Sequence, residues 1–217
     1  MKNLLIKDFR LSASILTYVF IAASLMTLLP GYPILIGAFF VCFGIFHSFQ
    51  EGRETKDILY TVLLPVPKED VVRAKYAFTC TIQVLSFIPM VLLTVLRMTV
   101  LGNAEVYRSN ALMNASPLYL AFVLLVFAAF NTVFLRCFFR SAYRIGIPFL
   151  AFGIATLILI AIGESLHFFP GLEFLNTPSG ERLGLQFLLL VIAVMIYAML
   201  TWVSCRSSVR RFEQLDL

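Results

Sequence analysis

The chain has 217 residues, of which 60% are hydrophobic and only 13% charged, and its formal net charge is +5. Soluble domains are roughly half apolar and a quarter charged, so this composition excludes a water-soluble globule. A transmembrane helix needs about 20 residues to cross a hydrocarbon core of roughly 30 Å, and the chain is long enough for several. The composition therefore indicates a polytopic membrane protein.

Six long apolar runs follow one another along the chain. They are continuously apolar and do not alternate as barrel strands do, so they predict transmembrane helices and an all-α fold. The residues from Pro30 to Pro33 carry a tight-turn signal between the first two runs. The six predicted spans are Leu11 or Ile15 to Leu29, Ile34 to Phe49, Ala77 to Leu96, Leu118 to Leu135, Ile145 to Ile162 and Leu185 to Val203.

Basic residues set the predicted orientation. Fourteen of the 17 Lys and Arg side chains fall in the N-terminal segment, in the loops after the second and fourth spans, and at the C-terminus. The positive-inside bias therefore predicts two cytoplasmic termini, as an even number of spans requires. The net charge needs no nucleic-acid partner, since basic membrane ends also face anionic lipid headgroups of the bilayer. We expect one transmembrane domain over 1–217, with a cytoplasmic or interfacial segment at 1–14, a cytoplasmic loop at 50–76 and an external loop at 163–184.

The sequence lacks the residue patterns of a catalytic or metal site. His47 and His167 fall on opposite sides of the predicted membrane, and no HExxH motif is present. No Lys directly follows a Gly, which excludes a phosphate loop of the GxxxxGK type. The four cysteines contain no CxxC pair, and we expect free thiols. We therefore predict no catalytic residues, no metal and no cofactor in this chain, and no ATP hydrolysis by this chain alone.

A few polar side chains lie inside the predicted spans, chiefly Gln83, Asn131 and Thr132. Intramembrane polar residues can line a substrate path, but hydrogen bonds between helices are the commoner role and contribute about 0.6 to 2 kcal/mol. Both interpretations are open for these three residues. A stripe of phenylalanines along the fourth span has the same two interpretations, with packing favoured. Its members are Phe122, Phe130, Phe134 and Phe138.

The loop at 50–76 is the most informative segment. It holds five basic and five acidic residues in a chain otherwise poor in charge, and it is longer than a simple connection requires. Its apolar residues recur at the spacing of one helical face before Pro65 and Pro67 end the helix. The acidic residues after Lys68 then suit the first turn of a helix that continues into the third span. The predicted apolar face comprises Ile58, Leu59, Val62 and Leu63.

A short, stiff helix at this position has two interpretations. Held between two spans, it can transmit motion from a soluble partner, because a rigid helix moves as a unit. It can also be an amphipathic segment that lies against lipid headgroups and binds nothing. The nearly balanced charge of the loop favours the first interpretation, since membrane-surface helices are usually richer in Lys and Arg.

Two stretches of the chain have a distinctive sequence. The first, LLIKDFRL, runs from Leu4 to Leu11. The second comprises Glu51, Asp57, Ile58, Leu59, Leu64-Pro65-Val66, Lys68, Val71-Val72 and Ala74-Lys75-Tyr76. Together with the span number, orientation and loop lengths, they resemble the ABC-2 type permease subunits of bacterial ABC exporters, especially small six-span members with separately encoded ATPases.

The resemblance implies a permease subunit of an ATP-driven exporter in the bacterial plasma membrane. Two permease subunits, either two copies of this chain or this chain with a paralogue, would form a translocation path above two ABC ATPase subunits that bind ATP and Mg. A coupling helix, here Lys56 to Leu64, would receive the motion of the ATPases. The residues assigned to this contact are Glu51, Asp57, Ile58, Leu59, Val62, Leu63, Pro65 and Lys68.

Two other functions stay open at the level of sequence. A membrane-embedded lipid-modifying enzyme would use Glu164, His167 and Glu173 near the outer surface, although their spacing matches no catalytic motif. A scaffold or immunity protein would bind a partner without transporting substrate. For a transporter, the Phe-rich interior suits peptides, lipids and hydrophobic drugs alike as substrates.

Overall fold

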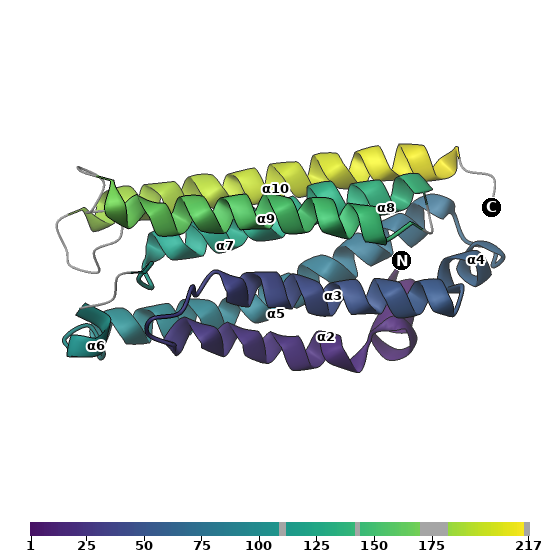
Figure 1. The fold of residues 1–217 in the computed structure, drawn as a ribbon. Coiled ribbons are helices and arrows are strands. Elements are labelled where there is room, and N and C mark those ends of the chain that lie inside the picture. Colours follow the sequence, from purple (N-terminus) through teal and green to yellow (C-terminus); the bar gives the residue numbers. More distant parts are fainter. Residues whose placement is uncertain (109–111, 142–143, 170–181, 215–217) are drawn as a thin grey trace.

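The computed structural model describes residues 1–108, 112–141, 144–169 and 182–214, and the regular elements within these residues are all helical. The predicted all-α class is therefore confirmed for the described part of the chain. The elements are α1 (Lys2–Lys7), η1 (Asp8–Ser12), α2 (Ile15–Val19), η2 (Phe20–Leu28), α3 (Ile36–Glu54), α4 (Asp57–Val62), α5 (Lys68–Thr99), α6 (Glu105–Arg108), α7 (Pro117–Ala129), η3 (Phe130–Leu135), α8 (Arg136–Ser141), α9 (Gly146–Ser165), η4 (Leu166–Phe168) and α10 (Leu183–Glu213) (Figure 1).

Four helical segments are long and apolar enough to cross a membrane, namely α5, the continuous segment Pro117–Arg140, α9 and α10. A fifth candidate is the pair Lys2–Ser12 and Ile15–Leu28, whose two limbs are bent by 94°. These segments contain or closely overlap five of the six predicted spans. The predicted second span lies in α3, which is not among the candidates and whose last turn is charged. The chain is a multi-pass membrane protein, and its described residues contain four or five candidate spans.

The N-terminal limbs and α3 form a closely packed hairpin. The chain leaves η1 through the extended backbone of Ala13 and Ser14, where it bends, and the hydroxyl of Ser14 caps α2 by accepting from the N–H of Leu16. The turn before α3 places Gly31 at a φ of +68°, a conformation that glycine adopts without strain. Gly44 of α3 allows close approach, because a Cβ there would lie 2.8 Å from the Cβ of Phe20.

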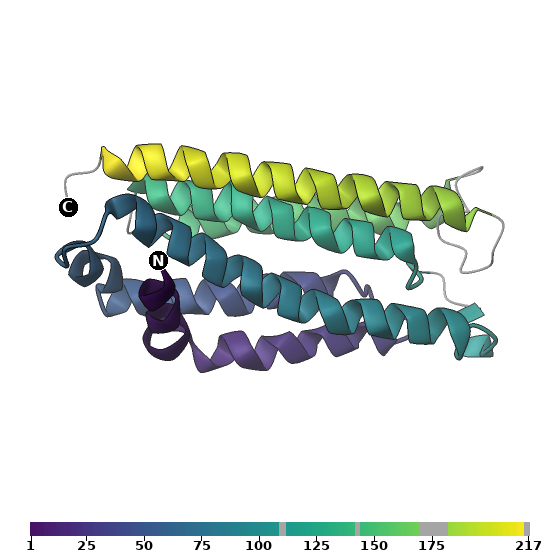
Figure 2. The same cartoon turned by 180° about the vertical axis from the view of Figure 1, so that it is seen from behind.

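The segment formed by α7 and η3 is the centre of the bundle. In its most apolar stretch 78% of the residues are buried, against 11% in α10, so α10 lies on the outside (Figure 2). The predicted phenylalanine stripe packs inward, and the rings of Phe130 and Phe134 stack with centroids 4.7 Å apart. Phe49 of α3 meets Phe134 edge to face at 5.5 Å, and Phe152 of α9 meets Phe130 at 5.1 Å. The stripe therefore packs helices together.

The two ends of the bundle are formed by different elements. The N-terminus, α4 and the C-terminal end of α10 lie together, and α6 lies at the opposite end (Figures 1 and 2). We call these the α4 end and the α6 end. The N-terminus and the C-terminal end of α10 thus share one end of the bundle with the loop that contains α4, which is the relative arrangement that the orientation prediction requires.

Candidate functional site

A short helix separated from its neighbours by two breaks stands at the α4 end. After α3, Lys56 adopts the left-handed conformation with a φ of 53°, which reverses the chain into α4. Asp57 occupies the first turn, where an acidic side chain favours the positive end of the helix dipole. The chain bends again over residues 64–66, and Pro67, with extended backbone, precedes α5. The predicted helix, break and helix are present, although α4 is shorter than the range Lys56 to Leu64.

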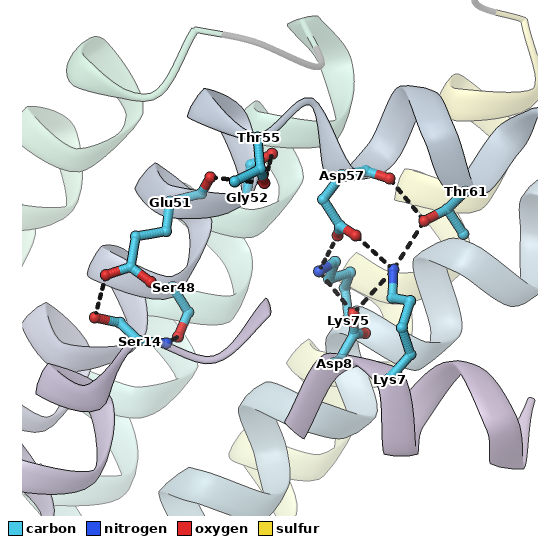
Figure 3. Close-up of polar contacts among 10 residues, drawn as sticks. All are labelled: Lys7, Asp8, Ser14, Ser48, Glu51, Gly52, Thr55, Asp57, Thr61 and Lys75. Carbon is cyan, nitrogen blue, oxygen red and sulfur yellow. Dashed lines mark hydrogen bonds and ion pairs between the residues drawn. The ribbon is translucent and has the colours of Figure 1, made fainter. Parts of the chain in front are cut away.

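A network of four charged side chains ties α4 to two other elements (Figure 3). Lys7 of α1 donates hydrogen bonds from Nζ to Oδ1 of Asp57 at 2.7 Å and to Oγ1 of Thr61 at 2.8 Å. Lys75 of α5 donates from Nζ to Oδ2 of Asp57 at 2.8 Å and to Oδ1 of Asp8 at 2.8 Å. Two cations thus face two carboxylates, and the network is electrically neutral.

These charges are shielded from water. The side chains of Asp8 and Lys75 are 2% and 8% exposed, and that of Asp57 is 14% exposed. Burial on its own raises the pKa of the Asp57 carboxyl, but Lys75 and Lys7 outweigh it and hold the pKa below its usual value. Because charge-assisted hydrogen bonds of this kind are strong, they fix the position of α4 relative to α1 and α5.

A second set of contacts fixes the bend of the N-terminal limbs against α3. Ser14 donates from Oγ to Oε1 of Glu51 at 2.6 Å, and its backbone N–H donates to Oγ of Ser48 at 2.9 Å (Figure 3). Thr17 donates from Oγ1 to the carbonyl of Gly44 at 2.6 Å. The N-terminal limbs are therefore bonded both to α3 and, through the charged network, to α4 and α5.

The residues predicted to contact an ATPase fall into two groups. Asp57 and Ile58 face inward: Asp57 lies in the charged network and Ile58 is 5% exposed. Leu63 and Pro65 are exposed, Leu63 to 74%. The inward or half-buried group also includes Leu59, Val62 and Lys68, whereas Glu51 is exposed and bonded to Ser14.

The prediction that Leu63 shares one face with Ile58 is wrong. Leu63 caps α4 with a helical backbone, but five positions after Ile58 it lies about 140° around the helix, and its side chain is 74% exposed. Its exposed neighbours are Tyr60, 63% exposed, and Leu64, 52% exposed. We call Tyr60, Leu63 and Leu64 the outer face of α4.

Three members of the charged network were not among the predicted site residues, namely Lys7, Asp8 and Lys75. Each lies in one of the two stretches that carry the family resemblance. A charged side chain within an otherwise apolar stretch was the signal available, because such a group needs a partner when it is buried. Sequence spacing gives no indication that the partner is Asp57.

A different polar network lies in the middle of the bundle. The side chains of Gln83 in α5 and Asn131 in η3 exchange two hydrogen bonds of 3.0 and 3.1 Å. Tyr197 of α10 donates to Gln83 at 2.8 Å, and Asn131 donates to Thr201 at 3.0 Å. The wide π turn of η3 also presents the Asn131 carbonyl to Ser204, which donates to it at 2.7 Å. These residues form the interhelical bonds that one of the two interpretations predicts.

The remaining polar residues singled out in the sequence have local partners. Thr132 donates to the carbonyl of Ala128 in its own helix at 2.8 Å. Glu164 accepts a hydrogen bond of 2.7 Å from the backbone N–H of Met113, which attaches the segment before α7 to α9. The side chain of His167, and Glu173 as a whole, lie outside the described residues, as does most of the loop at 163–184.

Comparison with known proteins agrees with this arrangement. No curated protein sequence and no solved structure gives a significant match to the chain. A family model described as ABC-2 family transporter protein matches residues 3–213, a range that includes α4, the charged network and all of the candidate spans except Lys2. The chain therefore belongs to the ABC-2 family of transporters and is a permease of that family.

Proposed function

We propose that this permease couples to a separately encoded ABC ATPase through the outer face of α4 and exports a hydrophobic substrate. Membership of the family implies an ABC ATPase as a partner in general. The observation that supports this point of contact is the division of α4 into a buried side held by Lys7 and Lys75 and an outer face of exposed apolar side chains. A helix held in this way is suited to passing a push from a partner into the bundle.

The contacts of α4 suggest where such a push would go. Asp57 is bonded to α1 and α5 at once, and α5 is a single helix from Lys68 to Thr99 that reaches the α6 end. Packed helices move as rigid units, so displacement of α4 would be passed to α5 and to the N-terminal limbs together. Coupling energy would then pass through ion pairs and a continuous helix.

The proposed assembly completes the membrane topology. We place α3 as the remaining span, which gives six, and the α4 end in the cytoplasm of a bacterial cell, because the basic residues are concentrated there. Two permease subunits, identical or paralogous, stand above two ATPases, which bind ATP and Mg, and this chain itself carries no catalytic residues. The translocation path runs near Gln83, Asn131 and Thr132, and peptides, lipids and hydrophobic drugs are the substrate classes that suit the apolar bundle.

The test uses the permease co-expressed with its ABC ATPase. The double variant Tyr60→Asp/Leu63→Asp places two charges on the outer face of α4. The control, Val106→Asp, adds a charge at an apolar residue of α6 that is 59% exposed, at the opposite end. Membrane insertion, co-purification of the ATPase and its ATP turnover with the permease are measured for each.

We expect the double variant to insert normally but to retain about a tenth or less of the wild-type ATPase, since charges in a desolvated apolar contact typically cost more than ~1.4 kcal/mol. The control should retain the wild-type amount. Full retention of the ATPase by the double variant would contradict the proposal. Equal loss in both variants would also contradict it, because the effect would then be independent of α4.

A further inference from the structure

The outer surface of α10 changes character along its length. From Leu188 to Val203 its exposed side chains are apolar, as expected for a helix that faces lipid. Trp202 lies within the last turn of this strip and is 62% exposed. The next helical turns carry Arg206, Arg210 and Arg211. Tryptophan and arginine in this order mark the level at which hydrocarbon gives way to headgroups.

The same surface is hollowed. A groove of about 280 Å³ is lined by Trp202, Val203, Arg206, Ser207, Arg210 and Arg211. It contains three cationic side chains and no carboxylate. The guanidinium of Arg206 stands 5.5 Å from the centre of the Trp202 ring, which orients it over the aromatic surface. Within the described residues, none of the three arginines forms an ion pair with a carboxylate.

A second, larger groove of about 720 Å³ borders the first and shares Trp202, Arg206 and Arg210 with it. This groove also includes Glu69, which is paired with Arg73, and Glu213. The larger groove therefore attracts an anion less strongly than the smaller one, because two carboxylates offset part of its positive charge. Among the described residues, the lining of the smaller groove is the more positive of the two, since its only charged members are three arginines.

We propose that the smaller groove on α10 binds the phosphate of an anionic phospholipid, with Arg206, Arg210 and Arg211 around the headgroup and Trp202 at the headgroup boundary. The acyl chains lie along the exposed apolar strip of α10, next to Met199 and Met195. Charge complementarity selects this occupant, because arginine forks match phosphate oxygens and the adjoining surface is apolar. The proposal does not depend on an ATPase or on the direction of transport.

Trp202 provides the measurement, since it is the only tryptophan of the chain. The full-length permease is reconstituted in vesicles of brominated phosphatidylcholine or brominated phosphatidylglycerol and in mixtures of the two, where bromine on the acyl chains quenches a tryptophan that it contacts. The dependence of quenching on composition gives the relative affinity of the Trp202 site for the two lipids. We expect phosphatidylglycerol to bind about fivefold more tightly at moderate salt.

Two variants separate a built site from general surface charge. In Arg206→Gln/Arg210→Gln, the affinities for phosphatidylglycerol and phosphatidylcholine should become about equal, while both brominated lipids still quench Trp202. Arg53→Gln/Arg140→Gln removes the same charge from exposed positions at the same end of the bundle and should keep the wild-type preference.

Three results would overturn the proposal. Equal quenching by the two lipids in the wild type would show that the groove does not select the anionic headgroup. Equal loss of preference in both double variants would show a general surface potential. Failure of both brominated lipids to quench Trp202 would show that protein, such as a second permease subunit, covers this face.

Discussion

The α4 end of the bundle and its middle both bury polar side chains, but the chemistry differs. At the α4 end the partners are two lysines and two carboxylates, and the network joins four elements, α1, η1, α4 and α5. In the middle the partners are amides and hydroxyls of α5, η3 and α10. The charged network lies at one end of the bundle, and the neutral network lies among the apolar helices of its middle.

This difference indicates what each network does. A buried ion pair is costly to break, so the charged network gives α4 one defined position. Neutral interhelical bonds are weaker individually and hold helices together without a large desolvation cost. The α4 end is thus suited to transmitting displacement as a unit, and the middle is suited to holding α10 and η3 against α5.

The largest expected effect comes from Lys75→Met, which removes the cation shared by both carboxylates. We expect the free energy of unfolding in detergent to fall by about 3 to 5 kcal/mol, because Asp8 and Asp57 stay buried with only Lys7 as a partner. Denaturant unfolding measures the loss, and Lys75→Arg, which keeps the charge, should lose less. A loss below ~1 kcal/mol for Lys75→Met would mean that the charged network does not hold the fold.

In the middle of the bundle, Asn131→Leu tests the neutral network. The variant leaves the Gln83 amide without its reciprocal partner, and we expect a loss of about 1 to 2 kcal/mol. Thr132→Val is the matched control, because that hydroxyl bonds only within its own helix, and it should lose less than ~0.5 kcal/mol. If Asn131→Leu were as destabilising as Lys75→Met, the contrast between the two networks would fail.

Acid should weaken the charged network, because protonation neutralises its carboxylates. The pKa of Asp57 is lower in the folded chain than its usual value. The carboxylate therefore contributes fully to the free energy of unfolding above pH ~5, and this contribution decreases as the pH falls below ~3.9, the pKa of Asp in the unfolded chain. The melting temperature of the wild type should therefore exceed that of Asp57→Asn at pH 6, and the gap should narrow by pH 3.5. A gap that is constant over this range would contradict the role given to the Asp57 carboxylate.

The smallest effect on stability is expected at the outer face of α4. Leu63 is 74% exposed, so Leu63→Asp should change the free energy of unfolding by no more than about 0.5 kcal/mol. Denaturant unfolding of the permease alone tests this value. A large loss would show that Leu63 packs inside the protein and is not a free contact surface.

Local sequence patterns predicted much of the fold. The apolar runs gave the long helices, the residues from Pro30 to Pro33 gave the turn before α3, and the two prolines gave the break after α4. These features depend on neighbouring residues, which is why they can be predicted from one sequence. The 94° bend of the N-terminal limbs could not be predicted in this way, because it depends on hydrogen bonds from Ser14 to Ser48 and Glu51, which lie far along the chain.

The candidate site was predicted only in outline. The loop at 50–76 was identified from its charge and apolar spacing, but the partners of Asp57 are 50 and 18 positions away along the chain. No local pattern specifies such contacts. The apolar spacing placed Leu63 on one face with Ile58, whereas five positions along a helix separate the two side chains by about 140°.

Photo-crosslinking most directly tests the claim that the outer face of α4 contacts an ATPase. A benzophenone-bearing residue replaces Leu63 in the permease co-expressed with its ATPase, and the same residue replaces Val106 of α6 as the control. The structure predicts a covalent product of permease and ATPase from position 63 and none from position 106. A permease that crosslinks only to lipid from position 63, while the ATPase co-purifies with it, would contradict the claim.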